Sequence, residues 1–164
     1  MPALKRLSDS TGESAQLYIR MGKRRVCIAS SQSENELRTI VDVGADLPLT
    51  AGSAGKVFLG YAPEAEREPL LRNIPALTSS TVTDPGRLDR QISSARRRGW
   101  AQSVEERQEG VASVSAPVVE APGRLAAVVS LSGPMLRLGR RPGQHHAAAV
   151  MHAAREIEQA LGFA

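Results

Sequence analysis

Serine hydroxyls recur at alternate positions in two apolar segments of the second half of the chain. Ser113 and Ser115 lie in one segment, and Ser130 and Ser132 lie in the other. If both segments are strands, the alternation places Ser130 and Ser132 on one face together with small side chains such as Ala126. Buried hydroxyls need hydrogen-bond partners, and small neighbours leave space above them. The pattern is therefore typical either of a face that holds a polar ligand or of a face against which a helix packs closely.

A run of small residues, Gly52-Ser53-Ala54-Gly55, precedes Lys56 and an apolar stretch that predicts a helix. Free backbone N–H groups at the start of a helix can bind an anion, although small residues there can equally allow tight packing on a sheet. The run is not a phosphate loop, because Val57 replaces the required Ser or Thr and the upstream glycine is absent. Nucleotide hydrolysis is therefore not predicted. Lys56 is expected to pair with an acidic side chain rather than to join a site.

Catalytic and metal-binding patterns are weak. Cys27 stands between Val26 and Ile28 in an expected strand, which is typical of a buried, inert thiol. His145, His146 and His152 fall in the last expected helix without the spacing of four that a helical two-histidine metal site uses. The chain also lacks a G-x-S-x-G nucleophile elbow. We therefore expect neither an enzyme, nor a metal site, nor a cofactor.

Composition points to one cytoplasmic domain. The length of 164 residues and the hydrophobic content of 41% suit a single globular core. No apolar run approaches the roughly 20 residues that cross a bilayer, the first residues lack a signal-peptide pattern, and a single cysteine excludes an internal disulfide. The net charge of +4 is spread over short arginine clusters such as Arg96–Arg98, which fit the last turn of a helix. Specific DNA binding by the chain itself is therefore not expected.

Hydrophobic periodicity and turn residues divide the chain into helices and strands. The last strand is apolar on both faces, which indicates a sheet that is covered on both sides. The order of the elements predicts an α+β fold with an antiparallel central sheet of about six strands and helices on both sides. The first expected helix ends at Gly12, the second runs from near 51 through 59, and the others span 64–71, 85–98 and 144–161. The expected strands span 16–19, 26–29, 38–43, 111–119 and 125–131.

Several short motifs occur in an order that resembles one known family, and together they extend from about Leu4 to Gly162. They resemble the effector-binding domain of IclR-type bacterial transcriptional regulators, which has a GAF-like (profilin-like) fold. The motifs are Thr11-Gly12-Glu13, Leu47-Pro48-Leu49 with Ala54-Gly55-Lys56, Leu77-Thr78, Arg98-Gly99-Trp100-Ala101, Ser115-Ala116-Pro117-Val118 and Ser130-Leu131-Ser132-Gly133-Pro134.

The resemblance implies a single domain over residues 1–164 that senses a small-molecule effector. It also implies a cytoplasmic location and a homodimer or tetramer. In the family a winged helix-turn-helix domain precedes this one, so the chain is expected to lack that domain and to reach DNA only through it. No membrane partner is implied.

The resemblance also implies a set of pocket residues. Ser103 stands where many members of the family carry Asp, Thr50 replaces a usual His, and Ser53 replaces a common Gly. Because position 103 is not acidic, the pocket is less hostile to an anion. The expected effector is a small organic acid or an aromatic metabolite, held between the start of the helix and the sheet hydroxyls. The expected ligand-binding residues are Thr39, Ser53, Ala54, Gly55, Ser103, Val111, Ser113, Ser130 and Ser132, with Thr39, Ala54 and Val111 forming an apolar wall.

Two other functions remain open from the sequence. Some GAF-like domains are redox enzymes that act on oxidised methionine, but that chemistry needs a nucleophilic thiol and usually a resolving one. Cys27 alone cannot supply both. The chain could also be a dimerisation module with a vestigial pocket.

Overall fold

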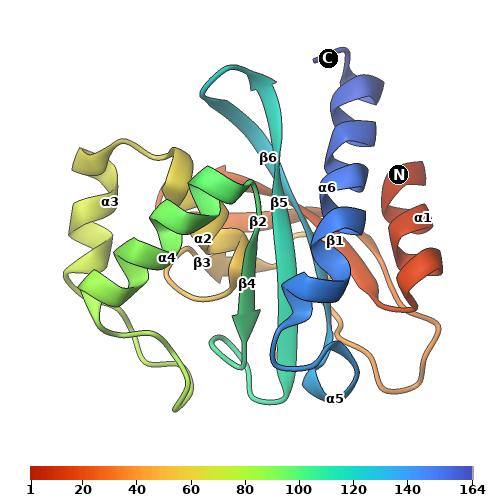
Figure 1. Cartoon of the computed structure of the whole chain (residues 1–164), viewed down its shortest axis with the longest axis horizontal. Coiled ribbons are helices and arrows are strands. Elements are labelled where there is room, and N and C mark those ends of the chain that lie inside the picture. Colours follow the sequence, from red (N-terminus) through yellow and green to blue (C-terminus); the bar gives the residue numbers. More distant parts are fainter. Residues whose placement is uncertain (164) are drawn as a thin grey trace.

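The computed structural model describes residues 1–163, which fold into helices packed on both faces of one sheet (Figure 1). The elements follow one another in the order α1 (Pro2–Thr11), β1 (Ser14–Met21), β2 (Arg24–Ser31), β3 (Asp46–Pro48), α2 (Ser53–Tyr61), α3 (Glu64–Leu71), α4 (Pro85–Arg98), β4 (Ala101–Val104), β5 (Val111–Ala121), β6 (Arg124–Pro134), α5 (Met135–Leu138) and α6 (Pro142–Leu161).

The sheet has six strands in the order β3-β2-β1-β6-β5-β4, and every neighbouring pair is antiparallel. Two hairpins, β1–β2 and β5–β6, meet through the pairing of β1 with β6, where Gln16 lies opposite Ser130. This arrangement confirms the predicted α+β class and the antiparallel sheet of about six strands.

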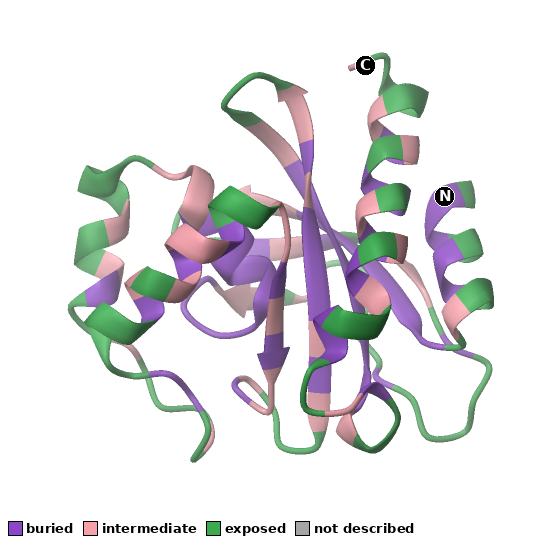
Figure 2. Ribbon diagram, viewed as in Figure 1, coloured by how far each residue is buried: buried purple, intermediate pink, exposed green. Residues whose placement is uncertain are grey.

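Helices cover both faces of the sheet, as the doubly apolar last strand predicted. Helices α1 and α6 pack on one face, and α2 and α4 pack on the other, with α3 beside α4 (Figure 1). The central strands are consequently buried along much of their length (Figure 2). Among residues 1–163 we find no helix whose length and hydropathy would suit a bilayer crossing.

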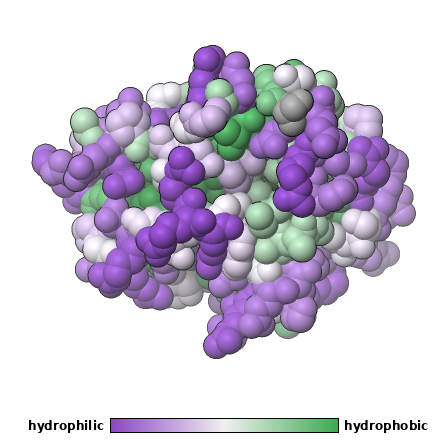
Figure 3. All heavy atoms as spheres, turned by 45° about the horizontal axis from the view of Figure 1, so that its top comes forward, coloured by the Kyte–Doolittle hydropathy of each residue, from purple (hydrophilic) through white to green (hydrophobic). Residues whose placement is uncertain are grey.

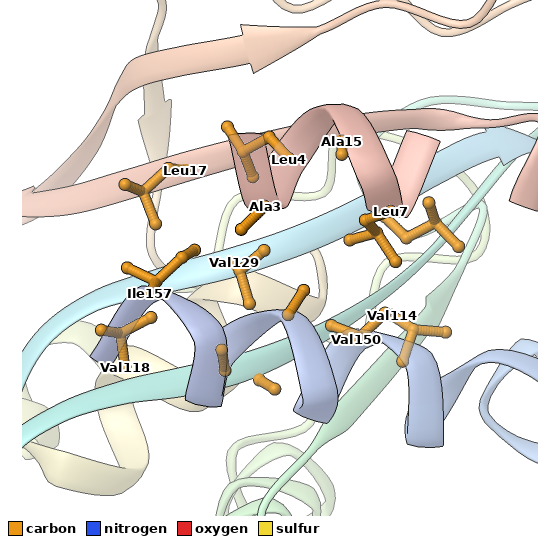
Figure 4. Close-up of a cluster of buried hydrophobic side chains, with 14 of the residues drawn as sticks. Ala3, Leu4, Leu7, Ala15, Leu17, Val114, Val118, Val129, Val150 and Ile157 are labelled. Atoms are coloured by element: carbon orange, nitrogen blue, oxygen red, sulfur yellow. The ribbon is translucent and has the colours of Figure 1, made fainter. Parts of the chain in front are cut away.

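The core under α1 and α6 is apolar. Leu4 and Leu7 of α1 and Val150 and Ile157 of α6 pack with one another and with the sheet (Figure 4). From β5 and β6 this core receives one alternating set of side chains, which includes Val114. Each fully buried Leu, Val or Ile contributes about 1.5–3 kcal/mol. This side of the sheet therefore supplies much of the stability of the domain.

The core under α2 and α4 is mixed. Phe58 and Leu59 of α2 pack with Leu88 and Ile92 of α4. The strand face beneath them carries the other alternating set of β5 and β6, in which the serines lie. The sequence pattern therefore assigned these hydroxyls to the correct face, opposite the apolar core of α6.

The expected strand over 38–43 is wrong. Residues 37–43, here called the strap, pair with no strand. Backbone hydrogen bonds to β2 begin only after the strap: Gly44 N–H donates to the Cys27 carbonyl, and Cys27 N–H donates to the Ala45 carbonyl. The third strand is β3, where a break had been expected. Burial alternates along the strap because one side of it lies on the sheet: Val41 is buried while Ile40 is exposed. Alternation reports burial, whereas a strand also needs a neighbouring edge with which to pair.

Two short elements, β4 and α5, carried too little pattern to be predicted. Each has only four residues. The longer helix α4 begins and ends as expected: the Asp84 side chain accepts a hydrogen bond from Arg87 N–H at 2.7 Å, and Gly99 ends the helix with φ of 82°.

Candidate ligand-binding site

A small cavity lies between the first turn of α2 and the serine-bearing face of β5 and β6. Its volume is about 30 Å³, which is room for one or two water molecules. The first turn of α2 closes it on one side, and the strap and the loop after β4 close it on others. The residues that line it are Tyr18, Arg25, Val41, Gly52, Ser53, Ala54, Ser103, Arg107, Gln108, Val111, Ser113, Ser130 and Ser132.

Seven of the nine residues expected at a ligand site line this one cavity. They come from α2, β4, β5 and β6, so segments far apart in the sequence converge as the family resemblance implied. The seven are Ser53, Ala54, Ser103, Val111, Ser113, Ser130 and Ser132.

Thr39 and Gly55 do not line the cavity. Thr39 is buried in the strap and borders a neighbouring groove together with Val111, while Val41, two residues further along, contributes to the cavity wall. The expected apolar wall of Thr39, Ala54 and Val111 is therefore formed by Val41, Ala54 and Val111 instead.

Gly55 positions the helix instead of forming the wall. A Cβ atom at Gly55 would lie 2.0 Å from the carbonyl oxygen of Leu49, so only glycine allows α2 to pack this closely against the chain that leads into it. Gly52, which caps α2 with φ of 93°, lies against the guanidinium of Arg25. The two glycines thus bring the start of α2 down onto the cavity.

The serine hydroxyls form a connected network. Ser53 Oγ lies 2.6 Å from Ser113 Oγ and 2.7 Å from Ser115 Oγ. Ser115 Oγ in turn donates to Ser130 Oγ at 2.9 Å. Hydroxyl groups donate and accept, so the network can reorient toward a ligand at little cost. Ser115 was not among the expected site residues, and it is fully buried and does not line the cavity.

Gln16 extends this polar face. Its Oε1 accepts a hydrogen bond from Ser132 Oγ at 3.0 Å, whereas its buried Nε2 has no hydrogen-bond partner within residues 1–163. The face therefore retains donor capacity beside Ser132.

Arg25 lines the cavity and was not among the expected site residues. Its side chain is buried, and its Nη1 donates to the carbonyl oxygens of Pro48 and, at 3.0 Å, Ala51. In the described part of the chain no carboxylate pairs with it, and its Nε has no hydrogen-bond partner. Burial lowers the pKa of Arg25 to about 10. A buried cation without a counter-ion is unfavourable, and a bound anion would relieve it.

The sequence did hold a signal for Arg25. Arg25 and Cys27 occupy the same inward face of β2, so alternation alone places an arginine where an apolar side chain is usual. An inward arginine on a strand is a stronger indicator of an anion than the flanking helix start, because buried arginine is rare without a partner.

The electrostatic balance of the cavity is positive. Arg107, which is half-buried, also borders it and further lowers the pKa of Arg25. No Asp or Glu is among the lining residues. The amino-terminal end of α2, where no side chain caps the helix, adds a partial positive charge. These features suit a small anion.

Lys56 pairs with an acid, as expected. Its Nζ lies 2.9 Å from each carboxylate oxygen of Glu106 and also donates to the Gln102 carbonyl oxygen at 2.9 Å. Both side chains are buried. Burial lowers the pKa of Lys56, and the charge of Glu106 opposes this effect. The pair is thus a structural element behind β4, outside the cavity.

Cys27 is unsuited to redox chemistry. It is fully buried, and burial raises the pKa of its thiol, which disfavours the reactive thiolate. In the part of the chain that the structure describes, no three His, Cys, Asp or Glu side chains are grouped in a way that could hold a metal ion.

The sequence matches a known protein family. Residues 1–159 match the family model described as the bacterial transcriptional regulator IclR C-terminal domain. The chain is 33% identical over 158 residues to the HTH-type transcriptional regulator BhcR of Paracoccus denitrificans, covering 95% of the chain and 57% of that protein. It is 32% identical over 160 residues to the glycerol operon regulatory protein of Streptomyces coelicolor, covering 95% of the chain and 62% of that protein. The chain thus spans less than two thirds of these relatives.

Solved structures share the fold. The IclR protein of Thermotoga maritima superimposes with a TM-score of 0.86 at 28% identity, over 98% of this chain and 66% of that one. The inducer-binding domain of the transcription factor PobR from Acinetobacter, solved with 3-hydroxybenzoic acid, superimposes with a TM-score of 0.85 over 95% of this chain and 93% of that one. At 21% identity the second likeness concerns the fold alone.

Proposed function

The chain belongs to the IclR family of bacterial transcriptional regulators as their C-terminal domain, and from this premise we propose that it senses a small carboxylate in the cavity under α2. Its relatives are regulators and not enzymes, so the domain is a regulatory one. The redox alternative is not proposed, because Cys27 is buried and is the only cysteine.

The observation that carries this proposal is the buried guanidinium of Arg25 without a carboxylate partner among the described residues. An incoming carboxylate would accept hydrogen bonds from the unused donors of Arg25, from the first backbone N–H groups of α2 and from Ser53 or Ser113. Charge-assisted hydrogen bonds of this kind are about twice as strong as neutral ones. The wall formed by Val41, Ala54 and Val111 would contact the carbon skeleton.

The size of the cavity limits the effector. A cavity of about 30 Å³ must widen to admit any organic acid, and it would widen less for a short-chain acid than for an aromatic acid. Arg107 and Gln108 lie on the loop at the cavity mouth and are the lining side chains most free to move outward for a larger ligand. A double mutant of the PobR inducer-binding domain, which shares the fold, was solved with 3-hydroxybenzoic acid, and a carboxylate is also the class of effector proposed here.

The wider role follows from the relatives. BhcR is named an HTH-type transcriptional regulator and is longer than this chain. We propose that the effector, once bound here, controls DNA binding by a separate winged-helix domain in a cytoplasmic homodimer or tetramer. The domain itself would carry no recognition helix.

The test is a thermal-shift and calorimetric comparison of acids with their neutral amides. Acetate, glycolate, lactate and benzoate would be compared with acetamide, glycolamide, lactamide and benzamide. One short acid should bind, and at a hundred times its Kd it should add about 2.7 kcal/mol to the free energy of unfolding. Its amide should add nothing measurable. Equal stabilisation by acid and amide would contradict an anion-selective cavity.

A further inference from the structure

A second and larger hollow lies between α4, the loop at residues 79–82 and β4. Its volume is about 540 Å³, which falls in the size range of small-molecule sites. Only the β4 wall separates it from the cavity under α2, because Ser103 borders both. We call this hollow the α4 cleft.

Three exposed arginines from two separate segments line the α4 cleft. Arg87 and Arg98 lie at opposite ends of α4, and Arg140 lies between α5 and α6. Within the described residues none of the three forms an ion pair. Arg98 is held in place, since its Nε donates to the Trp100 carbonyl oxygen at 2.8 Å and its guanidinium stacks 3.6 Å from the Trp100 ring centroid.

The acidic side chains of the α4 cleft are already engaged. Glu106 is bound to Lys56, and Glu105 accepts a hydrogen bond from Gly110 N–H at 2.9 Å. The lining therefore holds four cationic side chains against two acidic ones, a surplus of two positive charges: Lys56, Arg87, Arg98 and Arg140 against Glu105 and Glu106.

Neutral hydrogen-bonding groups complete the lining. Ser79, Ser80 and Ser94 present hydroxyls to the α4 cleft, and Gln91 lies among them. The Oε1 atom of Gln91 is buried and accepts no hydrogen bond from any described residue. It is free to accept a hydrogen bond from a ligand hydroxyl. Hydrophilic side chains also cover most of the molecular face in Figure 3.

We propose that the α4 cleft binds a phosphate monoester at a site distinct from the carboxylate cavity. The planar fork of arginine matches the oxygens of a phosphoryl group and binds them through paired hydrogen bonds. A phosphoryl group offers three peripheral oxygens to the guanidiniums and serine hydroxyls that line the cleft, whereas a carboxylate offers only two. Gln91 would recognise the hydroxyl-bearing part of the ester. The site does not depend on the proposed effector function.

The experiment is calorimetric titration of the full chain with glycerol 2-phosphate, with inorganic phosphate and glycerol as separate probes. The ester should bind most tightly, phosphate more weakly, and glycerol not at all. The double variant Arg87→Gln/Arg140→Gln should weaken ester binding by at least about tenfold, because two charge-assisted contacts are lost. The matched double variant Arg90→Gln/Arg97→Gln removes the same charge from exposed positions of α4 that do not line the cleft. It should change the affinity less than about twofold, as expected for distant screened charges.

Other results would overturn the proposal. If both double variants weaken ester binding equally, the net positive charge of the protein attracts the ester, and contacts in the cleft do not. Absence of ester binding at millimolar concentration would refute the site directly. Direct binding of duplex DNA that displaces the ester from the wild type, and that is weakened by Arg87→Gln/Arg140→Gln and not by Arg90→Gln/Arg97→Gln, would assign the cleft to nucleic acid. Loss of ester binding in Arg25→Met would place the anion in the carboxylate cavity, whereas retained binding supports a separate site even if no carboxylate effector is found.

Discussion

Arg25 combines full burial with the absence of an acidic partner among the described residues. Such a side chain destabilises the empty protein and favours the occupied one. Its contacts with the carbonyls of Pro48 and Ala51 fix the guanidinium in place without neutralising it. Arg25 is therefore suited to making ligand binding depend on the negative charge of the ligand.

We expect Arg25→Met to separate binding from stability. Affinity for the carboxylate that stabilises the wild type should fall by at least about tenfold, which corresponds to the loss of one charge-assisted hydrogen bond. The free energy of unfolding without ligand should stay within about 1 kcal/mol of the wild type or rise, because a desolvated charge is removed along with its bonds. Calorimetry and urea denaturation measure the two quantities.

Arg24→Met is the matched control for Arg25→Met. Arg24 is the preceding residue, and its exposed side chain pairs with Asp46 on the surface. Its replacement should leave carboxylate affinity unchanged. If Arg24→Met weakens binding as much as Arg25→Met does, long-range attraction and not a buried contact accounts for the affinity.

Glu106→Gln should destabilise the domain strongly. It leaves Lys56 buried and unpaired, which typically costs about 3–5 kcal/mol. Burial already lowers the pKa of Lys56, and loss of the Glu106 charge, which raises it, lowers that pKa further. Between this lowered pKa and the unfolded value the folded state binds fewer protons than the unfolded state, so stability rises with pH across that window.

The measurement is urea denaturation of Glu106→Gln at pH 7 and at pH 9.5. The stability deficit relative to the wild type should shrink at the higher pH, where part of Lys56 is neutral in the folded variant. Glu109→Gln, at an exposed position, is the control and should stay within about 0.5 kcal/mol of the wild type. A deficit that is the same at both pH values would show that the Lys56 charge is not its cause.

Among individual residues, the serines could be predicted and Arg25 was not. Alternation in two clear strands places Ser113, Ser130 and Ser132 on one face. The apolar pattern on β2 covers only residues 26–29, so Arg25 fell outside the expected strand although β2 begins at Arg24. Val41 was missed in favour of Thr39 because the register of the strap depends on contacts that no local pattern encodes.

At the scale of elements, the start of α2 is fixed by glycine. Gly55→Ala should lower the free energy of unfolding by roughly 3 kcal/mol. The new methyl group would lie 2.0 Å from the backbone oxygen of Leu49, which, unlike a side chain, cannot rotate away. The first turn of α2 must then move, so carboxylate affinity should fall as well. Thermal denaturation and calorimetry follow the two effects.

Gly86→Ala offers a helical comparison for Gly55→Ala. Its added methyl group meets other atoms only at 3.5 Å or more, an ordinary contact. The substitution should stabilise the protein by up to about 1 kcal/mol, since alanine is the better helix former. If Gly55→Ala is tolerated equally well, close packing is not what holds α2 over the cavity.

The long elements were predictable and the short ones were not. Helix α4 shows a cap, a regular apolar stripe and a terminal glycine, and the structure confirms each. The four residues of β4 are too few to show a period, and the strap shows a period without being a strand. Whether a segment pairs with an edge or covers a face depends on distant parts of the chain, such as the position of β3 beside β2.

At the scale of the whole molecule, we expect the chain to self-associate. This expectation is part of the proposed function, which includes a homodimer or tetramer. Sedimentation equilibrium at tens of micromolar should show a mass of two or four chains. A monomer throughout that range would count against the proposal, and the Arg25→Met variant should sediment like the wild type because its substitution is buried.

Strands β5 and β6 form a wall with two uses: Val114, Val129 and Leu131 face the apolar core, while Ser113 and Ser130 face the cavity. Neighbouring codons therefore specify opposite sides of the protein. Point substitutions can retune ligand preference during evolution while the core sequence is kept. A one-residue insertion or deletion would exchange the two faces, burying hydroxyls in the core and filling the cavity with valine. We expect effector preference to diverge within these strands by substitution, with length changes confined to the loops around them.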